Sequence, residues 1–77
     1  MMTYVVDLAP QVEKALAEMP EDGRQEVLET IAAVLVRRDV WPTLGGWDGA
    51  LWFGPRSWVV FVAYADGVDV LDLGWVG

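Results

Sequence analysis

The stretch ALWFGPRSWVVFVAYADGVDVLDLGWVG, residues 50–77, decides the fold of this 77-residue chain. Two groups of turn-forming residues, Gly54-Pro55-Arg56 and Ala65-Asp66-Gly67, divide it into short runs rich in Val, Trp, Phe and Tyr. Short β-branched and aromatic runs between tight turns are typical of consecutive antiparallel strands. The stretch therefore predicts a meander, with strands near 50–54, 57–65 and 68–75, and the boundaries carry an error of ~2–4 residues.

The residues before this stretch predict one strand and two helices. Residues 3–8 (TYVVDL) are short and β-branched, and Pro10 suits the first turn of a helix near 10–19. A second helix is expected over 22–38, with a capping box from Asp22 to Gln25 and with Arg37 and Arg38 in its last turn. Apolar periodicity predicts which helical side chains are buried against the sheet: Val12, Leu16, Leu28, Ile31 and Leu35.

The predicted order, β-α-α-β-β-β, indicates an α+β fold in a single domain spanning residues 1–77. We expect a helical hairpin packed on one face of a small antiparallel-rich sheet. The last strand, 68–75, is placed at an edge of this sheet, where Trp75, Val76 and Gly77 could pair with another chain.

The composition excludes several classes of function. A net charge of −7, from 12 acidic and 5 basic residues, disfavours binding to nucleic acid or to an anionic membrane. Cysteine and histidine are absent, so the usual zinc and iron sites cannot form and no cofactor is expected. No apolar run approaches the ~20 residues of a membrane span, and Met1–Tyr4 lacks the basic flank of a signal peptide. We therefore expect a small, acidic, cytoplasmic protein.

The polar residues of the meander do not form a catalytic or metal site. Asp66, Asp69 and Asp72 recur every third residue, but residues three apart in a strand point to opposite faces, so these are interpreted as solvated carboxylates. Asp66 belongs to an Asp-Gly turn, which is expected to need positive φ. Ser57 is the only serine and has no histidine to activate it. Catalytic residues are accordingly predicted to be absent.

The tryptophans point to binding. All five follow the predicted helices, and the middle meander strand is apolar on both faces, with Trp58, Val60, Val62 and Tyr64 on one and Val59, Phe61, Ala63 and Ala65 on the other. Two helices cover only one face of a small sheet, so the second face must meet the loop of residues 41–49, a second copy of the chain, or a partner. The expected binding residues are Trp52, Arg56, Trp58 and Trp75.

The whole pattern resembles the RelE/ParE superfamily of bacterial toxins. The resemblance rests on Tyr4–Pro10 before a helical hairpin, on the loop Leu44–Gly49, and on the meander segments Trp58–Val62, Asp66-Gly67 and Val70–Leu73. It implies the fold described above and an antitoxin-like protein as a partner. Self-association into a dimer is expected separately, from the apolar face of the sheet that the helices leave uncovered.

The resemblance also implies where a catalytic site would lie, and here the chain departs from the family. Ribosome-dependent ribonucleases of the superfamily place arginines on the first two meander strands and a basic or hydroxyl residue near the C-terminus. The corresponding stretches here are Trp52–Gly54, Ser57–Val59 and Gly74–Val76, and only Arg56 remains. Three hypotheses stay open: a toxin or toxin descendant that binds protein and lacks ribonuclease activity, an active mRNA endoribonuclease, and a self-associating interaction module without a toxin role. The missing arginines favour a protein that is not an enzyme.

Overall fold

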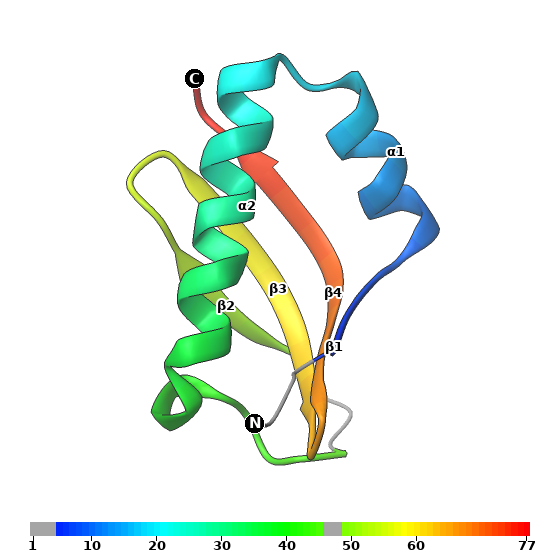
Figure 1. Ribbon diagram of the computed structural model, residues 1–77, viewed down its shortest axis with the longest axis vertical. Coiled ribbons are helices and arrows are strands. Elements are labelled where there is room, and N and C mark those ends of the chain that lie inside the picture. Colours follow the sequence, from blue (N-terminus) through cyan, green and yellow to red (C-terminus); the bar gives the residue numbers. More distant parts are fainter. Residues whose placement is uncertain (1–4, 46–48) are drawn as a thin grey trace.

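The computed structural model of the protein describes residues 5–45 and 49–77. Its elements follow one another in the predicted α+β order (Figure 1). Their boundaries differ by one or two residues from those expected, and residues 3 and 4 of the predicted first strand lie outside the described part. The elements are β1 (Val5–Leu8), α1 (Pro10–Glu18), α2 (Glu21–Val36), the short 3-10 helix η1 (Arg38–Val40), β2 (Ala50–Phe53), β3 (Ser57–Tyr64) and β4 (Gly67–Trp75).

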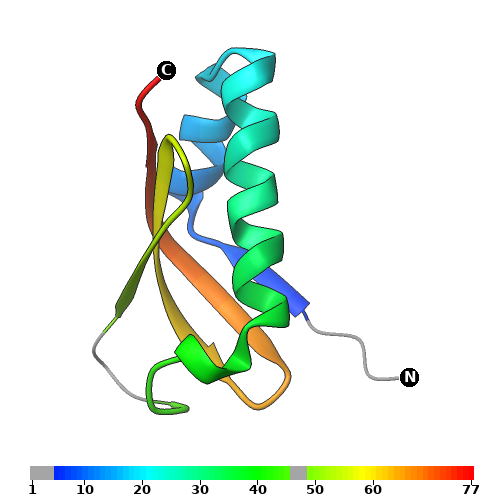
Figure 2. The ribbon, with the colours of Figure 1, turned by 90° about the vertical axis from the view of Figure 1, so that its left-hand side faces the viewer.

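The four strands form one mixed sheet in the order β1-β4-β3-β2. The meander β2-β3-β4 is antiparallel, and β1 adds to β4 in parallel. Both helices lie on the same face of the sheet, as Figure 2 shows from the side. The prediction that β4 lies at an edge is wrong for its first half, because β1 pairs with β4 from Gly67 to Val70. β2 forms the edge at the other side.

The core lies between the helical hairpin and the sheet. The α1 helix starts with Pro10 in its first turn, as predicted, and it buries Val12 and Leu16. On the sheet side, alternate residues of β3 and β4 turn toward the helices, and one irregularity at Leu71 interrupts this alternation on β4. The buried core residues are Val12, Leu16, Val27, Ile31, Val34, Val59, Phe61, Ala63, Val68, Val70 and Leu73.

Burial along α2 corrects one prediction. Val27, Ile31 and Val34 are buried as one stripe, but Leu28 is 45% exposed. Successive helical residues are rotated by about 100°, so Leu28 lies past the edge of the stripe that Val27 defines. Leu35 is only partly buried for the same reason.

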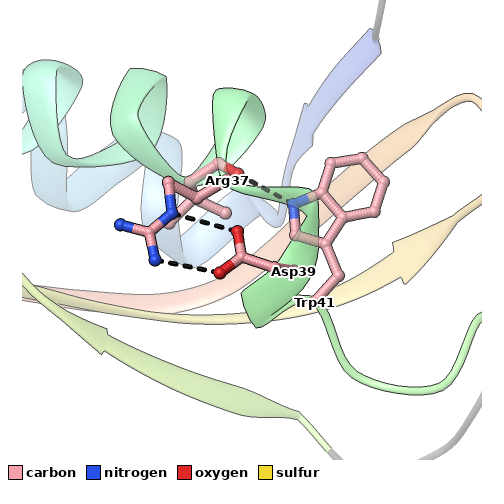
Figure 3. Close-up of polar contacts among 4 residues, drawn as sticks. Arg37, Asp39 and Trp41 are labelled. Atoms are coloured by element: carbon pink, nitrogen blue, oxygen red, sulfur yellow. Dashed lines mark hydrogen bonds and ion pairs between the residues drawn. The ribbon is translucent and has the colours of Figure 1, made fainter.

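Both ends of α2 also differ from the prediction. The helix begins at Glu21 after Pro20, and no side chain caps it, so the Asp22–Gln25 capping box does not form. It ends at Val36, before the two arginines. Arg37 instead donates two hydrogen bonds to Asp39, at 3.0 and 2.9 Å (Figure 3). The indole of Trp41 closes the helix by donating to the carbonyl of Val34 at 2.8 Å.

The turn between β3 and β4 does not use positive φ, contrary to expectation. Tyr64 pairs with Gly67, so the two turn residues are Ala65 and Asp66. Gly45, with φ of 73°, is the single positive-φ residue in the described ranges. Gly67 is needed for another reason: a Cβ there would collide with the carbonyl of Val5. The glycine thus lets β1 approach β4 closely enough to pair.

A β-bulge interrupts the pairing of β3 with β4. Val60 pairs with Asp72 and Phe61 with Val70, which leaves Leu71 unpaired on β4. The amide of Gln11 on α1 donates to the carbonyl of Leu71 at 3.1 Å. A bulge turns two consecutive side chains away from the regular alternation. Leu71 and Asp72 are accordingly both exposed.

Candidate functional site

The face of the sheet opposite the helices, which we call the open face, carries a group of exposed apolar side chains. In Figure 2 the helices lie on one side of the sheet and the open face on the other. Several large side chains remain exposed on it, among them Phe53 at 67%. Exposed apolar patches of this kind are typical of interaction sites. The apolar residues of the open face include Leu51, Phe53, Trp58, Val60, Leu71 and Val76.

The register of the strands makes this surface continuous. Phe53 is paired directly with Trp58, and Leu51 with Val60. Trp58 is paired in turn with Gly74, and a Cβ on Gly74 would collide with the indole ring of Trp58. The absence of a side chain on β4 therefore lets the indole lie over the next strand. Three strands contribute to one apolar surface in this way.

Two hollows flank the end of the β2-β3 hairpin. One, of about 250 Å³, opens on the open face and is lined by Phe53, Gly54, Pro55, Arg56, Ser57, Trp58 and Val76. The other, of about 240 Å³, opens between α2 and the β2 edge and is lined by Glu26, Glu29, Thr30, Ala33, Trp52, Phe53, Gly54 and Pro55. Three residues, Phe53–Pro55, line both hollows. The two hollows are therefore neighbours around the edge of the sheet.

Arg56 lies in the turn between β2 and β3 and is directed toward α2. Its Nε lies 3.7 Å from Oε1 of Glu26, and its side chain remains 62% exposed. The other carboxylate oxygen of Glu26 is buried without a hydrogen-bond partner in the described part of the structure. The charge of Arg56 is thus offset by a carboxylate of the protein itself. A phosphate at this place would compete with Glu26.

Ser57, the only serine, has a structural role. Its hydroxyl lies 2.5 Å from that of Thr30 on α2, and both residues are buried. Thr30 also donates to the carbonyl of Glu26 at 3.1 Å. This hydroxyl pair satisfies two polar groups inside the core, as burial requires. Although Ser57 lines one of the hollows, its hydroxyl is directed toward Thr30 on the helix side and is engaged there.

The four residues predicted to bind do not form one site. Arg56 and Trp58 line the same hollow. Trp52 points to the helix side of β2, where the guanidinium of Arg37 lies 5.7 Å from its ring centroid. Trp75 also faces the helices, because a Cβ on Gly23 of α2 would lie 2.6 Å from its ring. Trp52 and Trp75 thus support the helix layer.

Sequence reasoning missed several residues of the open face. Leu51, Phe53, Leu71 and Val76 join Trp58 there. The signal was present for Leu51 and Phe53, since both alternate with Trp52 along the same strand. Leu71 could not be predicted, because its exposure depends on the bulge. Trp47 was among the five tryptophans considered, and it lies outside the described residues.

Among the described residues, the charged side chains on the strands of the open face are acidic, and Arg56 lines the hollow on this face from its turn. Asp7 on β1 and Asp69 on β4 are directly paired across the parallel strands. Asp72 is paired with Val60. The five basic residues lie outside the strands: Lys14 on α1, Arg24 on α2, Arg37 and Arg38 at the end of α2, and Arg56 in its turn. Over residues 5–45 and 49–77, no group of three or more acidic side chains is placed to hold a metal ion.

The fold has a counterpart among solved structures. A chain of the archaeal RelE–RelB complex from Pyrococcus horikoshii superposes with a TM-score of 0.59 and is 28% identical in sequence. The match covers 99% of this chain and 98% of that one. The chain has a RelE-like toxin fold. The resemblance to the RelE/ParE superfamily is confirmed, and 28% identity fits a divergent member.

This RelE-like chain matches no protein-family model and no curated protein. None of the helices in the described residues is long and apolar enough to cross a membrane.

Proposed function

We propose that this chain is a RelE-like toxin, or a descendant of one, that acts by binding a protein and does not cleave mRNA. The observation that supports this proposal is the composition of the meander surface. Large apolar side chains and aspartates occupy it, and the one basic residue of 50–77, Arg56, is engaged by Glu26. The expected location is the cytoplasm, where a toxin of this kind would meet its target.

Ribonuclease chemistry requires groups that this surface does not offer. Cleavage of RNA needs a general base, a general acid and positive charge near the phosphate. Ser57 is buried against Thr30, and the chain has no histidine. The carboxylates of the open face would repel a phosphate backbone. These features argue against the ribonuclease hypothesis.

A protein partner is supported by two independent features. The open face exposes aromatic and aliphatic side chains in one continuous surface. The similar chain comes from an archaeal RelE–RelB complex. An antitoxin-like protein is therefore the proposed partner.

The proposal can be tested by producing the chain alone and together with the product of a neighbouring open reading frame. We expect growth arrest with the chain alone, relief by the second protein, and a stable complex in size-exclusion chromatography. Cut sites on translated mRNA should be mapped by primer extension, and we expect none. Cuts that disappear with Arg56→Ala would show that the chain is a ribonuclease. Normal growth and no complex would favour the interaction module without a toxin role.

A further inference from the structure

We propose that the open face binds a basic, apolar segment of a partner protein, one with large hydrophobic side chains flanked by lysine or arginine. This inference deepens the proposed function by stating the chemistry of the partner. It commits the face to a partner of opposite charge and not to a second copy of the chain.

Asp7 and Asp69 place two carboxylates next to each other on the open face. They are Cα partners on parallel strands, and both extend from the open face, because their neighbours Val6, Leu8, Val68 and Val70 face the core. Like charges directly opposite each other across a sheet are unfavourable. In the described residues neither aspartate has a basic neighbour on this face, since the basic residues lie on the helices and in the β2-β3 turn. A cation from outside would relieve this repulsion.

Asp72 places a third carboxylate beside the apolar residues. It is paired with Val60, and Leu71 precedes it on the bulge, so charge and apolar surface lie together. The apolar part recognises any hydrophobic segment, whereas the carboxylates select one that carries positive charge. Complementary charge around an apolar centre is how interfaces gain specificity.

A second copy of the chain fits this face less well. In a symmetric dimer the same patch meets itself, so the aspartates of both copies would enter one interface. The net charge of −7 adds repulsion between the two chains. Self-association would bury the apolar side chains but would leave the carboxylates without cations. The charge distribution therefore favours a different protein.

The test uses the purified chain and two synthetic helical peptides as probes. Both peptides carry the same apolar face, one flanked by lysines and the other by glutamates. We expect calorimetry to detect binding of the lysine peptide only, with an affinity that falls as salt is raised because the flanking charges are screened. In NMR spectra the indole signal of Trp58 should shift, and that of Trp75 should not, since Trp75 lies on the helix side.

Variants localise the binding. The pair Asp7→Asn and Asp69→Asn together should weaken the lysine peptide by about three- to tenfold, as expected for two exposed charge pairs. Phe53→Ser should weaken it by about tenfold or more, because an aromatic side chain loses its contact. The control for the aspartate pair is Glu13→Gln combined with Glu18→Gln, which removes two exposed charges on α1. The control for Phe53→Ser is Val36→Ser, at an exposed apolar residue of α2. Both controls should leave binding of the lysine peptide unchanged.

Three outcomes would overturn the inference: equal affinity for the glutamate peptide, binding unaffected by the open-face variants, or a dimer of the chain alone that Phe53→Ser dissociates. The last would assign the face to a second copy. The proposed function fails separately. An antitoxin-like complex insensitive to the open-face variants would leave that function standing, whereas mRNA cleavage would remove it whatever the peptides do.

Discussion

The two faces of the sheet carry similar side chains and have different roles. Phe61 on β3 is 1% exposed under the helices, and Phe53 on the neighbouring strand is 67% exposed on the open face. Both are aromatic, and they lie on adjacent strands of one sheet. The difference teaches that the position of the helical hairpin, and not side-chain hydrophobicity, decides which apolar residues stabilise this protein. On the other face Val62 is buried as well, but Leu51, Phe53 and Val76 stay exposed and available for binding.

The largest effect expected from this comparison is at Phe61. Phe61→Ala removes a fully buried ring from the core and should lower the free energy of unfolding by ~3–5 kcal/mol. A domain of this size has a stability near the lower part of the usual ~5–15 kcal/mol range. We therefore expect the variant to be largely unfolded in thermal and urea denaturation monitored by circular dichroism.

The counterpart is Phe53→Ala, the same change on the open face. Its effect on stability should stay within about 0.5 kcal/mol, because the ring is exposed in both the folded and unfolded chain. A decrease in the free energy of unfolding as large as that of Phe61→Ala would contradict the assignment of Phe53 to an exposed face. It would mean that another chain covers Phe53 in solution. Repeating the unfolding at several protein concentrations distinguishes that case.

A smaller effect is expected from the hydroxyl pair inside the core. Ser57→Ala leaves the buried hydroxyl of Thr30 without one partner and should cost ~1–2 kcal/mol. Thr30→Val combined with Ser57→Ala removes both polar groups, so its cost should be less than the sum of the single changes. Urea unfolding of the two single variants and the double variant gives the coupling. Strict additivity would show that the two hydroxyls do not interact in solution.

The smallest effect is expected from the ion pair at the end of α2. The hydrogen bonds from Arg37 lower the pKa of Asp39 below its ordinary value of 3.8. A lowered carboxyl pKa adds stability that is present above the unfolded pKa and is lost as pH falls through the folded one. Because both side chains are largely exposed to solvent, the pair is screened. Asp39→Asn should therefore leave the melting temperature at pH 7 nearly unchanged.

The measurement for Asp39 compares melting temperatures of the native chain and Asp39→Asn from pH 7 down to pH 2. The small difference should vanish on the acid side, where the native carboxyl is protonated too. A large loss at pH 7 would mean that this surface pair contributes as much as the buried face.

Much of the fold could be predicted because local signals agreed with one another. Turn residues at 54–56 and 65–67 bounded the strands, and Pro10 marked the start of α1. The predictions were wrong where the burial or the role of a residue depends on residues that are close in space but distant in sequence. Leu28 is exposed because the stripe through Val27 faces the sheet. Gly67 is required by the approach of β1 and not by its turn, and no local pattern reveals such a contact.

The candidate site was only partly predictable from the sequence. The excess of apolar residues on β3 correctly indicated that one face stays uncovered by the helices. Which tryptophan belonged to that face depended on register, so Trp52 and Trp75 were grouped with Trp58 although they point the other way. The opposition of Asp7 and Asp69 arises from a parallel pairing between distant segments. Sequence spacing alone cannot show it.

The parallel pairing of β1 also sets the order in which the protein folds. The meander hairpins join neighbouring segments, and such hairpins form in ~1–10 μs. The first strand must instead pair with residues from Gly67 onward, which are far along the chain. Closing so long a loop costs conformational entropy before the contacts that compensate for it can form. We expect β1 to dock last and its amide hydrogens to exchange early. During synthesis β1 leaves the ribosome before β4 has been made. Its backbone N–H and C=O groups then stay unpaired and accessible to chaperones until β4 is complete.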